Sequence, residues 1–83
     1  MNTVIFESGL IKTLTAIGLD TDFGNIGKIL FTSGASGNVA CVFEDDTVLI
    51  MPVEVIQDGH PRIKQINTTG TTVTTSDIYI GFQ

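Results

Sequence analysis

The residues that could carry out chemistry stand in short polar segments, and the first of these begins like a calcium-binding loop. Its sequence is Asp20-Thr21-Asp22-Phe23-Gly24-Asn25. An EF-hand loop needs an oxygen ligand at its fifth position, Gly at its sixth and Glu at its twelfth. Those positions hold Gly24, Asn25 and Phe31. The segment is therefore expected to form a polar turn rather than a calcium site.

Two glycine-containing segments come close to a phosphate-binding loop and to a hydrolase motif. In Gly24-Asn25-Ile26-Gly27-Lys28, a phosphate loop would need Gly in place of Asp22 and Ser or Thr in place of Ile29. In Ser33-Gly34-Ala35-Ser36-Gly37-Asn38, a nucleophile elbow would need Gly in place of Asn38. Both segments therefore predict turns, and neither predicts catalysis.

The remaining candidates are one histidine, one cysteine and an acidic turn. Asp58 could orient His60 as a general base, but the sequence places no nucleophile beside it. Cys41 lies in an apolar run, which is typical of a buried thiol. Glu44-Asp45-Asp46 could bind a hard cation, although acids between two strands also form ordinary hairpin tips. One His and one Cys cannot build a standard zinc site, so no catalytic, metal-binding or cofactor-binding residue is expected.

Length and charge narrow the classes of function. Residues 1–83 are enough for one domain with a single core. The net charge is -5, and among the four basic residues only Arg62 and Lys64 lie close together. Nucleic acid is bound through clustered Lys and Arg, so it is not an expected partner. Neither secretion nor a membrane span is expected, because Met1 to Glu7 lack basic residues and no apolar run reaches roughly 18–20 residues.

The composition favours strands over helices. Eleven Ile, seven Val and twelve Thr make up thirty of the 83 residues, whereas Ala and Leu together number eight. β-Branched side chains lose rotamer freedom in a helix and pack well on a pleated sheet. The sequence therefore predicts a mostly β fold, a small antiparallel sandwich or open barrel with at most one short helix. The turn signals predict strands near residues 3–7, 28–33, 38–44, 47–57, 62–67 and 71–82.

The acidic turn marks the clearest hairpin. It joins Val39–Phe43 to Thr47–Met51, and a short polar loop between two apolar runs makes them antiparallel neighbours. Pro52 has no N–H, so its strand is expected to bend there or to lie at an edge. Asp58-Gly59-His60-Pro61 predicts a second turn, with Asp-Gly supplying the positive φ.

Residues 10–17 are ambiguous between helix and strand. Leu10, Leu14 and Ile17 fit a helical stripe, with Ser8 as the N-cap and Gly18 after the last turn. The β-branched residues in the same segment favour a strand, and the strand is the interpretation adopted.

The C-terminal segment is rich in threonine and then apolar. Six of the nine residues from Thr68 to Ser76 are Thr. In the strand that follows, side chains alternate between two faces. An apolar strand without a charged tail is prone to aggregate unless it is covered. With only 16% charged residues in the chain, we expect self-association or docking through this strand. The expected interface residues are Ile78, Tyr79, Ile80 and Phe82.

Thr71-Thr72-Val73-Thr74-Thr75 and Ile78-Tyr79-Ile80-Gly81-Phe82, with the small size and the acidity, resemble the small structural proteins of tailed-bacteriophage virions, in particular capsid decoration (cement) proteins. The resemblance covers all 83 residues. It implies a β-rich homo-oligomer, with a trimer favoured, that lies over seams between capsid subunits.

The expected function is that of a non-enzymatic virion component that decorates or cements a phage capsid, with a larger protein scaffold as partner and no cofactor. Outside a virion the chain would be cytoplasmic. One alternative is a small cellular β-module that binds a peptide or ligand at an open sheet edge. Another is an enzyme subunit whose site is completed by a partner chain.

Overall fold

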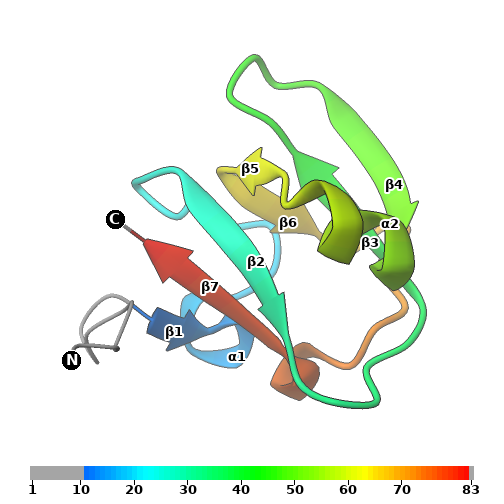
Figure 1. Ribbon diagram of the computed structural model, residues 1–83. Coiled ribbons are helices and arrows are strands. Elements are labelled where there is room, and N and C mark those ends of the chain that lie inside the picture. Colours follow the sequence, from blue (N-terminus) through cyan, green and yellow to red (C-terminus); the bar gives the residue numbers. More distant parts are fainter. Residues whose placement is uncertain (1–10, 83) are drawn as a thin grey trace, which may run out of the picture.

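The computed structural model describes residues 11–82 and contains two antiparallel sheets (Figure 1). The four-stranded sheet has the order β1-β7-β2-β5, formed by Ile11–Thr13, Ile78–Phe82, Gly27–Phe31 and Arg62–Ile63. The three-stranded sheet has the order β4-β3-β6, formed by Val48–Pro52, Asn38–Val42 and Gln65–Asn67. The predicted mostly β, sandwich-like class is confirmed, while the strand predicted at residues 3–7 lies outside the described residues.

The ambiguous segment contains both a strand and a helical turn. β1 is followed directly by the helix α1, Leu14–Ile17. The hydroxyl of Thr13 accepts a hydrogen bond from the Ala16 N–H, so Thr13 rather than Ser8 is the N-cap. Gly18, with a φ of 99°, ends the turn. The strand interpretation is therefore right for three residues and wrong for the next four.

The helix α2, Val53–Gly59, occupies a segment that was predicted as the continuation of a strand to residue 57. Pro52 ends β4 and is the N-cap residue of α2. Val53 and Ile56 are buried. Their spacing of three residues places them on the same face of a helix, whereas a strand would turn them to opposite faces. Burial of this pair outweighs the β propensity of the segment.

The predicted turn after α2 is also formed differently. Gly59 is the last residue of the helix, and the positive φ, 46°, belongs to His60. The N–H of His60 donates to the carbonyl of Ile56 at 2.8 Å and closes the last turn. Pro61 follows immediately and cannot continue a helix.

The two sheets and the two α-helices share one core of aliphatic side chains. The chain passes between the sheets several times, most abruptly at Lys64, the single residue between β5 and β6. No described side chain has a buried nitrogen or oxygen without a hydrogen-bond partner. The core residues are Leu14, Ile29, Val39, Cys41, Val53, Ile56, Ile63, Ile66, Val73, Ile78 and Ile80.

The C-terminal strand β7 lies in the middle of its sheet (Figure 1). It pairs with β1 on one side and with β2 on the other. Ile78 and Ile80 are fully buried, while Tyr79 and Phe82 are partly exposed. The protein's own core therefore covers most of this apolar strand. Ile78 and Ile80 are not available for the external interface that the sequence suggested.

The threonine-rich segment forms turns rather than the strand predicted from residue 71. The hydroxyl of Thr71 accepts from the Ala40 N–H at 2.9 Å and donates to the Asn67 carbonyl at 2.6 Å. The hydroxyl of Thr72 accepts from the Asn38 N–H at 2.9 Å. Threonine hydroxyls can bond to the backbone in place of ladder partners, and here they complete one side of β3.

Candidate interaction surface

Asp20 connects two neighbouring loops, whereas Asp22 bonds within its own loop. The carboxylate of Asp20 accepts from the hydroxyl of Thr68 at 2.6 Å and from its N–H at 2.9 Å, and these bonds lower the pKa of Asp20. Asp22 accepts from the Gly24 N–H at 2.7 Å, which is a local turn. Within residues 11–82, no group of three His, Cys, Asp or Glu side chains is placed to hold a metal ion.

Replacement of Asp20 should weaken the fold in a pH-dependent way. The folded state lowers the pKa of this carboxyl, so its contribution to stability is complete above the unfolded pKa and is lost as the pH falls through the folded pKa. We expect Asp20→Asn to lower the thermal midpoint at pH 7, and its difference from wild type to shrink below about pH 4. Thermal unfolding at a series of pH values measures this, with the exposed Asp58→Asn as control. A difference that stays constant with pH would contradict it.

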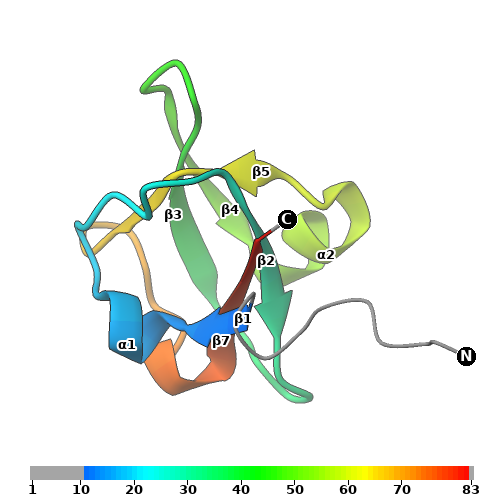
Figure 2. The same ribbon diagram turned by 90° about the vertical axis from the view of Figure 1, so that its left-hand side faces the viewer.

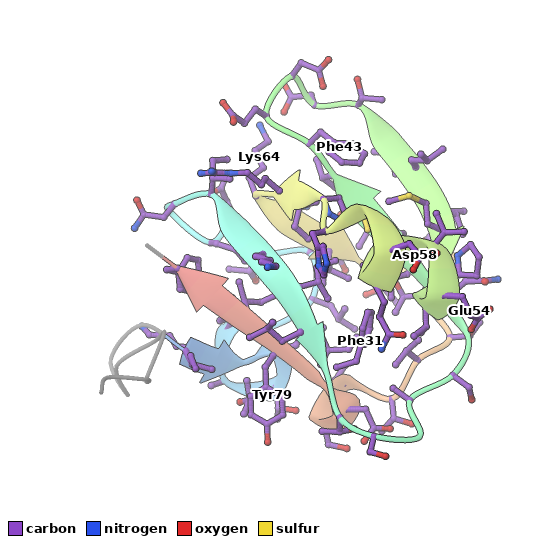
Figure 3. The ribbon with its side chains drawn as sticks, viewed as in Figure 1. Phe31, Phe43, Glu54, Asp58, Lys64 and Tyr79 are labelled. Carbon is purple, nitrogen blue, oxygen red and sulfur yellow. The ribbon has the colours of Figure 1, made fainter. Side chains whose placement is uncertain are left out.

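The acidic turn between β3 and β4 closes the predicted hairpin, which is confirmed (Figure 1). The Thr47 N–H donates to the Asp45 carboxylate at 3.0 Å, and hydrogen bonds from Thr47 lower the pKa of Asp45. Asp46 has a φ of 70° and pairs with the Lys64 ammonium group, which raises the pKa of Lys64. The Lys64 N–H donates to the Val42 carbonyl at 2.9 Å, so Lys64 lies beside the end of β3, near the base of this turn (Figure 3). Two of the three acids therefore stabilise the turn itself.

A shallow hollow beside the loop at residues 22–26 is open to solvent. It is lined by Asp22, Gly24, Asn25, Ile26 and Lys64. Its cation, Lys64, is already paired with Asp46. Ligand sites are usually enclosed, whereas this hollow is open to solvent.

Cys41 and His60 are not brought together as nucleophile and base. Cys41 is fully buried in β3, and burial raises the pKa of its thiol to about 12. The thiol therefore stays protonated at neutral pH and is shielded from solvent. His60 is exposed at the end of α2, and Ser36 is exposed in the turn before β3. The thiol is therefore in the core, whereas the histidine and the serine are on the surface in different loops, and they form no common site.

The most unusual described surface is the strand β4, at one edge of the three-stranded sheet. Val48, Leu49 and Ile50 are 49%, 50% and 52% exposed. Figure 1 shows β4 at the margin of the molecule, with no described element beyond it. In Figure 2 the strand again lies beside β3, and the turn that joins them projects from the molecule. We call Val48, Leu49 and Ile50, with their backbone, the β4 edge.

The side chains of the β4 edge lie on both faces of the sheet. Leu49 is opposite Cys41, a core residue, so it lies on the inner face at the margin of the core. Ile50 is opposite Ala40 and Val48 is opposite Val42, so both lie on the outer face. The exposed strand therefore presents large apolar side chains on both of its faces.

The ladder between β3 and β4 shows which backbone groups face outward. The Phe43 N–H donates to the Thr47 carbonyl at 2.9 Å, so residues 43 and 47 form a hydrogen-bonded pair. Such pairs alternate along an antiparallel ladder. The pair at Leu49 is therefore hydrogen-bonded to β3, and the pairs at Val48 and Ile50 are not. The N–H and C=O groups of Val48 and Ile50 point away from β3, toward the open edge.

The opposite edge of the same sheet is covered. The Asp20 N–H donates to the Ile66 carbonyl at 2.8 Å, and the Phe23 N–H donates to the Lys64 carbonyl at 2.8 Å. The loop at residues 20–23 therefore takes the place of a further strand beside β6. Of the two edges of this sheet, the described chain leaves β4 open.

No protein-family model matches this sequence, and comparisons with curated proteins and with solved structures identified no similar protein. None of the described helices is long and apolar enough to span a membrane. The function must therefore be argued from the chain itself.

Proposed function

We propose that this chain is a non-enzymatic structural protein that joins a larger protein assembly by pairing its β4 edge with a strand of another protein chain. The observation that carries the proposal is a run of three half-exposed apolar residues on a strand whose outward backbone groups have no partner in the described chain. Proteins usually protect such edges with charges, because an open apolar edge promotes pairing with other chains. Strand addition uses the backbone groups for affinity and the side chains for specificity.

Free-energy magnitudes indicate what kind of partner is needed. Full burial of a large apolar side chain contributes about 1.5–3 kcal/mol, so the exposed halves of these three contribute about 2–4.5 kcal/mol. Each net backbone hydrogen bond adds about 0.5–1.5 kcal/mol. Association itself costs about 4–15 kcal/mol. The β4 edge alone therefore gives weak binding, and a partner with an apolar strand of its own, or repeated contacts in an assembly, makes it stable.

Within this proposal the assembly is a virus particle and the scaffold is a capsid shell. The support is the resemblance of the chain, in size, acidity and threonine-rich C-terminal sequence, to the decoration proteins of tailed bacteriophages. The open edge also suits a second function, a small β-module that binds an extended peptide. The two functions differ in the size of the complex that forms.

Sedimentation of the tagged chain in extracts of its source tests the proposal. Wild-type protein is expected in the fast-sedimenting particle fraction. Ile50→Lys is expected to reduce that fraction at least tenfold, because a lysine on an edge strand opposes pairing. The matched control is Val55→Lys, which changes a residue of the same exposure, 51%, on α2.

Both variants must first show the wild-type circular dichroism spectrum. Wild-type protein that sediments only as a small species would contradict the virion role. Equal recovery of Ile50→Lys and wild type in particles would contradict the role of the β4 edge. A complex with a single short peptide would identify the binding module instead.

A further inference from the structure

The part of β4 that can accept another strand is limited at both ends. At one end Pro52 has no N–H to donate. At the other end Asp46, with a φ of 70°, turns the chain toward β3. The usable edge is therefore the short stretch from Thr47 to Met51, with Leu49 at its centre.

This stretch is complementary to itself. Its outward donors and acceptors belong to Val48 and Ile50, which lie symmetrically on either side of Leu49. In an antiparallel pair of two copies centred on Leu49, Val48 of one copy is opposite Ile50 of the other, and each N–H meets a C=O. Pro52 of each copy is then opposite Asp46 of the other, so the same pair of residues limits the ladder at both of its ends. Other registers would leave some of these groups unpaired.

The side chains match in the same register. On the outer face, Val48 of one copy lies beside Ile50 of the other, next to the buried residues Ala40 and Val42 of β3. On the inner face, Leu49 meets Leu49 at a non-hydrogen-bonded position, where side chains approach most closely. Apolar side chains therefore meet apolar side chains on both faces.

We infer that the β4 edge pairs with the β4 edge of a second copy of this chain, antiparallel about a twofold axis at Leu49, to form a continuous six-stranded sheet. This inference rests on the proposed function, because it names the partner at the same edge. Pairing of identical patches closes with two copies, so the dimer is the unit that enters the larger assembly, and another surface of the dimer contacts the scaffold. The trimer implied by the resemblance would need a different surface.

The charges at the two ends of the edge oppose this pairing and give it a recognisable salt dependence. Glu44 and Asp45 precede the edge, and Glu54 follows it on α2 (Figure 3). In the twofold arrangement these acids of one copy approach Glu54 of the other. Salt screens repulsion between exposed charges, so the dimer is expected to strengthen as salt rises. A foreign strand with basic ends would show the opposite dependence.

A disulfide at the axis tests the register. We would compare Leu49→Cys with Ile50→Cys under mild oxidation, both in a Cys41→Ala background. This background removes the one native thiol, which lies opposite residue 49 and could form a disulfide within the chain. Directly opposed residues at a non-hydrogen-bonded position have Cα atoms about 4.5 Å apart, within the range of a disulfide, whereas residues offset by two positions do not face each other. Leu49→Cys is expected to form covalent dimer at least tenfold faster than Ile50→Cys.

Sedimentation velocity of the unmodified chain provides a second measurement. The chain is expected to pass from monomer to dimer as its concentration rises, at lower concentration in about 0.15 M than in about 0.01 M salt, since the Debye length falls from about 30 Å to about 8 Å. A monomer at all concentrations, or equal cross-linking at both positions, would overturn the inference. If the chain did not dimerise but Ile50→Lys still lost its association with particles, the proposed function would be supported without the inference. A chain that dimerised but was never found in particles would contradict only the proposed function.

Discussion

A chain that stops at Ser76 is expected to lose its tertiary structure, because the truncation removes the central strand of the four-stranded sheet. β7 forms three residue pairs with β1 and five with β2. Without it, neither of those strands has its main partner. The truncation also removes Ile78 and Ile80, both fully buried in the shared core.

The expected loss is comparable to the whole stability of a domain of this size. Truncation of a buried Ile to Ala costs about 2–5 kcal/mol, so the two residues alone account for about 4–10 kcal/mol. The whole free energy of unfolding of a domain is about 5–15 kcal/mol. The lost ladder hydrogen bonds add to the deficit. Far-UV circular dichroism and the absence of a cooperative thermal transition would show the result.

Tyr79→Ser in the full-length chain is the control for the truncation. Tyr79 lies in the same strand but is only partly buried, and Figure 3 shows its side chain directed away from the interior. This variant is expected to keep the fold. A truncated chain that remained folded and merely lost self-association would mean that β7 serves an interface after all.

Local signals in the sequence were sufficient for the hairpin. The acidic turn between two apolar runs predicted β3, β4 and their antiparallel pairing, which the register confirms. Pro52 was expected at a bend or an edge, and it ends an edge strand. These features depend on neighbours within a few residues, where turn chemistry and the missing N–H of proline act directly.

Features that depend on distant partners could not be predicted in this way. The central place of β7 follows from pairing with residues 27–31, about fifty positions earlier in the chain. The helix α2 depends on burial of Val53 and Ile56 in the shared core, which overrides the β propensity of its residues.

The β4 edge was missed for a related reason. An unbroken apolar run such as Val48-Leu49-Ile50 is typical of a strand buried on both faces. The order of strands in the sheet, with nothing beyond β4 in the described chain, is what exposes it. The available signal for an edge strand was the proline that follows this apolar run, because proline favours an edge position.

Replacement of Gly27 by alanine is expected to destabilise the protein by about 1–3 kcal/mol, because the added methyl group has no space. Gly27 is buried in β2, opposite Phe82 of β7 and Ile63 of β5. A Cβ atom there would overlap the Cγ2 of Ile80 and approach the Phe82 ring at 3.1 Å. Ile80 is fully buried, so it cannot move away without disturbing the rest of the core.

Gly59→Ala is the matched control for this substitution. Gly59 ends α2 without a positive φ, and a Cβ atom there would meet nothing within 4 Å. Alanine also restricts the unfolded chain more than glycine does, so this variant is expected to stabilise the protein by about 0.4–1 kcal/mol.

Thermal or urea unfolding of both variants measures the two effects with opposite signs. For a domain of this size, 1 kcal/mol corresponds to a shift of about 4–8 °C in the thermal midpoint. Gly27→Ala should therefore melt at a clearly lower temperature than wild type and Gly59→Ala at a slightly higher one. If Gly27→Ala were as stable as wild type, β2 and β7 would have to pack less closely than the register at Gly27 and Phe82 requires.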